Sequence, residues 1–221
     1  MKEKDFYTGI VESFDDFVDR FGSTIRHFPE LVNKKLDGFH TLRPLGQYVA
    51  FFDQHEYQQA QFLKNNDALK AVYLRLNEQL GEETFVGDWY TVDQAGIDQF
   101  GLVTGDQQWI HTDPERAKSE SPFKSTIAHG FLTLALIPLL TESVDPDKNI
   151  FPEARMVVNY GLNRVLFPFP VKVGKRIRAR ARIIRLVPMK RGLEVVREIK
   201  IEIEDSARSA CIAETVLRLY F

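Results

Sequence analysis

A carboxylate and an imidazole stand five positions apart in the segment 104–111, whose sequence is TGDQQWIH. The carboxylate belongs to Asp106, directly after Gly105, and the imidazole to His111. An imidazole titrates near neutral pH, and a carboxylate can orient a water molecule or accept its proton. The pair therefore indicates general acid–base chemistry. Gly-Asp is also a common turn dipeptide, so a structural turn beside a structural histidine is the alternative interpretation.

A third group that can take part in such chemistry is Gly130, in the sequence Ala128-His129-Gly130. It precedes an apolar run, 131–140, that contains no charged residue and reads as a helix buried nearly all round. An exposed backbone N–H at the start of such a helix, at the positive end of its dipole, can hold a developing oxyanion. The three groups together favour a reaction in which negative charge builds up on a carbonyl oxygen.

Short helices and turns are expected to position these groups. The segment 88–92 resembles a short strand, and Asp93 then starts a helix that ends before the Gly105 turn. Asp113 followed by Pro114 is typical of a helix N-cap and first turn, so we expect Asp113 to be structural. A further turn is expected at 121–123.

The last third of the chain predicts antiparallel strands. Apolar residues alternate with arginines over 176–183, a turn is expected at 190–192, and alternation resumes over 199–204 before a final strand at 211–220. Acidic residues of the second strand can then lie opposite the arginines of the first. A phosphate-binding patch for nucleic acid or a nucleotide tail is the alternative for these arginines. The order of elements favours an α+β fold in which a sheet wraps around a helix.

Residues 1–85 read as helical. Apolar stripes recur at helical spacing, and they are expected to pack on a core or, alternatively, to dock a partner. The stripes are Ile10, Phe14, Phe17 and Phe21, then the segment 47–64, then Leu69, Val72, Leu76 and Leu80, closed by Gly81. His27, His40 and His55 have no second ligand at metal spacing.

The composition indicates the class of protein and its expected location. The chain has 221 residues, is 44% apolar and carries a net charge of −2, as expected of a soluble protein of one or two domains. From residue 160 onward, 14 Lys/Arg face 6 Asp/Glu, a surplus of +8 that leaves −10 for the first 159 residues. The lone Cys211 excludes an internal disulfide, no membrane span is predicted, and the charged N-terminus favours a cytoplasmic location.

The motifs together resemble a known family. Gly105-Asp106, His111, Ala128-His129-Gly130 and the segment 159–165 (NYGLNRV) look like those of MaoC/NodN-type dehydratases, which are hotdog-fold relatives of R-specific enoyl-CoA hydratases. The resemblance covers 86–221 and leaves 1–85 as a helical N-terminal extension. It implies a long central helix over 130–140, a curved antiparallel sheet, and a homodimer or higher homo-oligomer with acyl-CoA tunnels near the subunit contact.

The resemblance also implies roles for individual residues. Asp106 and His111 match the catalytic pair that activates one water, and the N–H of Gly130 matches the oxyanion donor. Gln108, Ser125 and His129 are expected to line the substrate, which is an acyl-CoA or acyl-carrier thioester. The alternatives are a Ser125 hydroxyl that caps local backbone and a His129 that only supports the turn. The implied reaction is reversible hydration of a trans-2-enoyl thioester to the R-3-hydroxyacyl thioester, without metal, redox cofactor or nucleic acid.

Gln108 and Trp109 occupy the places in which the hydratase signature usually has Asn and Pro. A Gln amide keeps the hydrogen-bonding type on a longer arm, so it can still orient a catalytic side chain. A hotdog acyl-CoA thioesterase and a non-catalytic acyl-binding or scaffold protein are the alternative functions. A thioesterase would release free thiol. A non-catalytic protein would keep its biological activity when the Asp106/His111 pair is lost.

Overall fold

The computed structural model describes residues 57–143, 145–148 and 150–221. The expectations for 1–56, including the first apolar stripe and His27, His40 and His55, lie outside the described residues. The chain forms two compact units, 1–67 and 68–221. In the first, residues 57–64 are helical. The boundary predicted at residue 85 stays a prediction.

Six strands and six α-helices are described with both ends. The helices are α3 (Asp67–Asn77), α4 (Gln94–Thr104), α5 (Trp109–Thr112), α6 (Pro114–Glu120), α7 (Gly130–Ala135) and α8 (Ile137–Leu140), with a 3-10 turn at Pro146–Lys148. The strands are β1 (Glu83–Val86), β2 (Tyr90–Thr91), β3 (Met156–Leu166), β4 (Arg176–Met189), β5 (Gly192–Ile203) and β6 (Ser209–Tyr220).

The strands form one antiparallel sheet in the order β1-β4-β5-β6-β3, and β2 also pairs with β4. The predicted meander is confirmed: β4, β5 and β6 are consecutive neighbours, and Lys190-Arg191 makes the turn between the first two. The strand expected at 88–92 shortens to Tyr90–Thr91. The sequence patterns did not predict β1 or β3 as strands; β3 contains the segment 159–165.

The arginines of β4 pair across the sheet, as predicted. Arg178 lies opposite Glu202 with a 3.0 Å contact, Arg182 lies opposite Glu198 at 2.9 Å, and Arg176 bonds Glu204. The alternating Ile and Ala side chains of β4 are buried on the other face. Cross-strand pairing therefore accounts for these arginines.

The helix expected to run unbroken from 130 to 140 is instead two short helices, α7 and α8. Pro138 has no N–H to donate to the Leu134 carbonyl, which interrupts the helix between them. The prediction that this segment is buried nearly all round was also wrong. Leu132, Ile137 and Leu140 pack on the sheet, whereas Phe131 is 68% exposed and Leu139 is 48% exposed.

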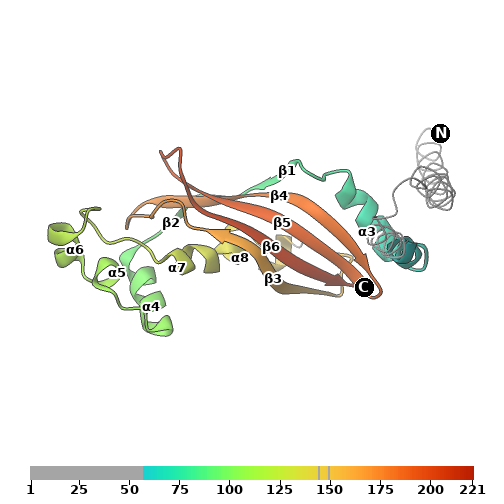
Figure 1. The fold of residues 1–221 in the computed structure, drawn as a ribbon, viewed down its shortest axis with the longest axis horizontal. Helices are drawn as coiled ribbons and strands as arrows, with labels where there is room; N and C mark the ends of the chain where they lie inside the picture. The colour runs from blue at the N-terminus through green and yellow to red at the C-terminus, as the bar shows by residue number, and fades with distance from the viewer. Residues whose placement is uncertain (1–56, 144, 149) are drawn as a thin grey trace, which may run out of the picture. The chain divides into compact units, whose positions relative to one another are not determined.

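The sheet and the two helices enclose the apolar core expected of a hotdog fold, with α7 and α8 along one face of the curved sheet (Figure 1). Its fully buried members include Ile177 and Ala179 of β4, Ile199 and Ile201 of β5 and Ala213 of β6. Burial raises the pKa of the Cys211 thiol, also in this core, to about 11.

The helices α4, α5 and α6 gather at one end of the sheet, near β2 (Figure 1). Asp93 caps α4 by accepting the Gly96 N–H at 2.8 Å, and Asp113 caps α6 by accepting the Arg116 N–H at 3.0 Å, which confirms both predicted caps. In the part of the chain that is described, no helix has the length and apolar character needed to span a bilayer.

Candidate active site

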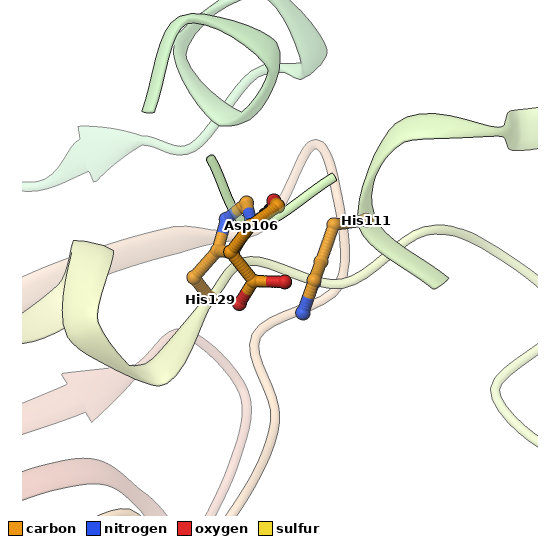
Figure 2. A group of neighbouring side chains, drawn as sticks. All are labelled: Asp106, His111 and His129. Carbon is orange, nitrogen blue, oxygen red and sulfur yellow. Dashed lines mark hydrogen bonds between the residues drawn. The ribbon is translucent and has the colours of Figure 1, made fainter. Parts of the chain in front are cut away.

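Asp106, His111 and His129 meet at the end of the sheet where α4, α5 and α7 approach one another. One nitrogen or carboxylate oxygen from each residue lies within 4.8 Å of the others. Figure 2 shows the Asp106 carboxylate beside the His111 ring, with His129 close to Asp106. The structure thus brings together the predicted acid–base pair, and it adds a second imidazole from a segment 18 residues further along the chain.

His111 is buried in α5, and its ring orientation is fixed by the main chain. Its Nδ1 lies 2.7 Å from the carbonyl oxygen of Ile127. A carbonyl only accepts, so Nδ1 carries the hydrogen and Nε2 of the neutral ring is left with a free lone pair. Burial lowers the pKa of His111 below its ordinary value; the hydrogen bond to Ile127 and the Asp106 charge act in the opposite direction. His111 is therefore suited to act as a base at neutral pH.

Asp106 follows α4 at a turn that glycine makes possible. Gly105 has φ = 78°, in the left-handed region, and ends the helix. The Gln108 side-chain amide donates to Asp106 Oδ1 at 3.2 Å. Gln108 therefore orients the Asp106 carboxylate. The sequence predicted that a Gln amide, with its longer side chain, can do this.

Gly130 is the first residue of α7, so its N–H has no intrahelical acceptor. Its Cα lies against the ring of Phe167: a Cβ at this position would be 2.9 Å from Phe167 Cγ. Any other residue would therefore push the aromatic ring or the helix start away. This contact explains why a glycine is needed at Gly130 although its backbone angles do not demand one.

Ser125, a predicted site residue, and Trp109, which departs from the hydratase signature, make different contacts. The Ser125 hydroxyl is buried and makes no hydrogen bond to any described residue, so it does not cap local backbone. Trp109, in the place where the resemblance expects proline, begins α5 and lies under the Arg116 guanidinium, 4.5 Å from ring centroid to Cζ.

Sequence reasoning missed residues that hold the site in place. Gln94 of α4 donates to the His111 carbonyl at 2.8 Å and accepts from Thr126 at 2.5 Å, which links α4, α5 and the segment before α7. Nothing in the local sequence marked this glutamine. Gly101, inside the α4 pattern, gave a weak signal: a Cβ there would be 3.0 Å from the Asp106 carbonyl oxygen.

The three residues are not arranged to share one metal ion. The rings of His111 and His129 are stacked, with centroids 3.8 Å apart and planes inclined at 27°. Imidazole lone pairs lie in the ring plane, so two nearly parallel rings direct them along separate planes. Because a histidine-bound ion lies about 2 Å from nitrogen along that lone pair, one ion does not fit both rings.

Comparisons with known proteins identify relatives of this chain. Residues 76–204 match the model of the MaoC like domain family. The 3-hydroxyacyl-thioester dehydratase Z of Mycobacterium tuberculosis (strain ATCC 25618 / H37Rv) is 42% identical over 139 residues, covering 62% of this chain and 89% of that protein. Nodulation protein N of Rhizobium leguminosarum bv. viciae is 42% identical over 146 residues, covering 65% and 88%.

Solved structures share the fold. The monoamine oxidase regulatory protein from Archaeoglobus fulgius superposes with a TM-score of 0.56 at 24% identity, covering 64% of this chain and 90% of that one. A MaoC-like dehydratase from Rhodospirillum rubrum superposes with a TM-score of 0.53 at 19% identity, covering 64% and 92%. At these identities the likeness concerns the fold.

Proposed function

Since the chain belongs to the MaoC like domain family, we propose that it is a 3-hydroxyacyl-thioester dehydratase, a hydro-lyase that reversibly adds water to a trans-2-enoyl thioester. The observation that carries the proposal is the pairing of Asp106 with a buried His111 whose Nε2 is free to act as a base. A relative with this activity in its name matches over most of its own length.

In the hydration direction, Asp106 and His111 Nε2 hold one water against C3 of the substrate. The base takes a proton as the water oxygen bonds to C3, and the electrons of the double bond move towards C2 and the thioester oxygen. A proton is then delivered to C2 from the same face. Hydroxyl and hydrogen thus both derive from water, and the expected product is the R-3-hydroxyacyl thioester.

The N–H of Gly130 is the proposed donor to the thioester oxygen while enolate-like charge develops there. A preorganised donor at such a position contributes on the order of 3 kcal/mol to transition-state stabilisation. Gln108 keeps Asp106 in place, and we propose that the Ser125 hydroxyl, which bonds none of the described residues, faces the substrate. The reaction as written needs no redox step.

We also propose a homodimer in the cytoplasm. β3 is an edge strand of the sheet, and it exposes large apolar side chains to solvent in the single chain, as does α7. These are Phe131, Met156, Val157, Tyr160 and Leu162. An exposed apolar edge strand of this length is a ready surface for pairing with a second copy.

The test follows loss of enoyl-thioester absorbance with crotonyl-CoA and longer trans-2-enoyl-CoAs. Asp106→Asn and His111→Gln should each lower kcat/KM by about a hundredfold or more, because each removes one of the two groups that activate water. Chiral analysis of the 3-hydroxyacyl product checks the R configuration.

Glu115→Gln, a charge change on an exposed residue of α6 whose side chain bonds neither Asp106 nor His111, is the matched control and should keep full activity. Free thiol is measured in the same reactions. Thiol release in place of hydration would identify a thioesterase, and full activity in both pair variants would remove Asp106 and His111 from the mechanism.

A further inference from the structure

His129 makes a set of contacts that the hydration mechanism does not use. The residue is 2% exposed, and its Nε2 lies 2.8 Å from the main-chain carbonyl oxygen of Asp106. Its ring is stacked on His111 and tilted against Phe100 at 5.2 Å. Although His129 occupies the N-cap position of α7, its side chain makes no capping bond. The His129 side chain therefore contacts neighbouring segments and does not cap its own helix.

The contact with Asp106 fixes the hydrogen of His129. Since the Asp106 carbonyl only accepts, Nε2 carries the hydrogen and Nδ1 is the bare nitrogen of the neutral ring. That Nδ1 is buried and has no hydrogen-bond partner among the described residues. A second proton there would have no acceptor and would place a buried cation 3.8 Å from the His111 ring.

Gly101 leaves space for the contact between His129 and the Asp106 carbonyl. Gly101 of α4 faces both partners: a Cβ there would lie 3.0 Å from the Asp106 carbonyl oxygen and 3.5 Å from His129 Cε1. A side chain at this point would therefore crowd the Asp106 carbonyl oxygen that His129 binds. α4, the Asp106 turn and the start of α7 are thus joined through one buried imidazole.

We propose, on the basis of the dehydratase function above, that His129 is a positioning residue: it anchors the Asp106 main chain and holds the His111 ring as an unprotonated base, without touching the substrate. This replaces the expectation that His129 lines the substrate. The titratable groups acting on His111 are His129, which lowers its pKa, and Asp106, which raises it; burial is the largest influence and lowers it.

Two substitutions separate the bond from His129 to the Asp106 main chain from the stacking of His129 on His111. His129→Phe keeps an aromatic ring against His111 but loses the donor to Asp106, so kcat should fall about tenfold or more while KM changes less than about threefold. His129→Gln keeps a donor but loses the ring. Opening the stack exposes the His111 ring to water and so relieves its burial, which raises the pKa of His111, and the acidic limb of kcat/KM should move to higher pH.

Side-chain NMR titration of His111 provides a readout that does not need activity. In the wild type, His111 should titrate below its ordinary value with hydrogen on Nδ1, and in His129→Gln the midpoint should rise. Resonances are assigned by their loss in His111→Gln. If the wild type shows no hydration, the proposed dehydratase function fails while this titration still decides the role of His129.

Two outcomes would contradict the positioning role of His129. A rise in KM with kcat intact in both variants would make His129 a substrate contact. An unmoved acidic limb and an unmoved NMR midpoint in folded His129→Gln, with folding checked by circular dichroism, would overturn the positioning role.

Discussion

At the scale of single residues, the site depends on which hydrogen-bonding atoms the main chain has already occupied. The Ile127 and Asp106 carbonyls take up one nitrogen of His111 and one of His129, respectively. This leaves a single free lone pair on His111 beside the Asp106 carboxylate. A histidine held in one tautomer is a better base than one free to rotate, since its proton-accepting nitrogen always faces the reaction.

Gly130→Ala tests the proposed oxyanion donor at this scale. The added methyl would meet the Phe167 ring at 2.9 Å, so the start of α7 or the ring must shift. Overpacking of this kind costs about 1–3 kcal/mol, and we expect a lower unfolding free energy by chemical denaturation. Displacement of the Gly130 N–H should also lower kcat by about tenfold or more.

The double variant Gly130→Ala/Phe167→Leu is the control. A smaller side chain at Phe167 relieves the contact, so stability and part of the activity should return relative to Gly130→Ala alone. If the single variant is as active and as stable as the wild type, the close contact with Phe167 does not constrain the site.

At the scale of elements, short helices place the groups of the site. α5 is one turn long and contains His111, and α6 begins directly afterwards with Asp113 as its cap. Isolated helices of this length are not stable in water. The Asp113 cap of α6 and the Gln94 bond to the His111 carbonyl must therefore help to fix them.

Asp113→Ala should lower the unfolding free energy by about 1 kcal/mol, because the Arg116 N–H loses its acceptor. kcat/KM should stay within about twofold of the wild type, since the carboxylate is used in capping. Asp113→Asn, which still caps, should match the wild type in both measurements. A hundredfold loss of activity in the Ala and Asn variants alike would instead make Asp113 a catalytic group.

At the scale of the whole molecule, the single chain leaves apolar surface uncovered. The exposed side chains of α7 and β3 lie where a soluble monomer would bury them or replace them with polar groups. The break between α7 and α8 does not remove this surface, because Phe131 and Leu139 still face away from the sheet. A second copy is the occupant that we propose.

Leu162→Asp, on β3, should convert the dimer to a monomer, because an unpaired carboxylate would be buried at the contact. Light scattering should give about twice the 25.5 kDa chain mass for the wild type and the single mass for the variant. Leu80→Asp, with a similar exposure of 43%, lies in the turn after α3 and should leave the dimer intact. A monomeric wild type would contradict the proposal.

Much of this protein is determined by local sequence. Period-two alternation places the buried face of β4 and β5, and the strand pairing follows because a one-residue slip would expose every isoleucine. Asp93, Asp113 and Gly105 mark helix ends through backbone groups within a few residues. The Asp106/His111 pair is visible for the same reason, since both residues belong to one short segment.

Tertiary structure alone decided the rest. β3 has exposed residues on both faces in the single chain, so its sequence carries no alternation to read. His129, Gln94 and Phe167 reach the site across separations of 17 to 37 residues, through contacts that no local pattern encodes. The tautomer of His111 likewise depends on a carbonyl 16 residues away. The sequence identifies the side chains that can act as acid or base, but the orientation and protonation of these side chains are set by the packing of distant segments.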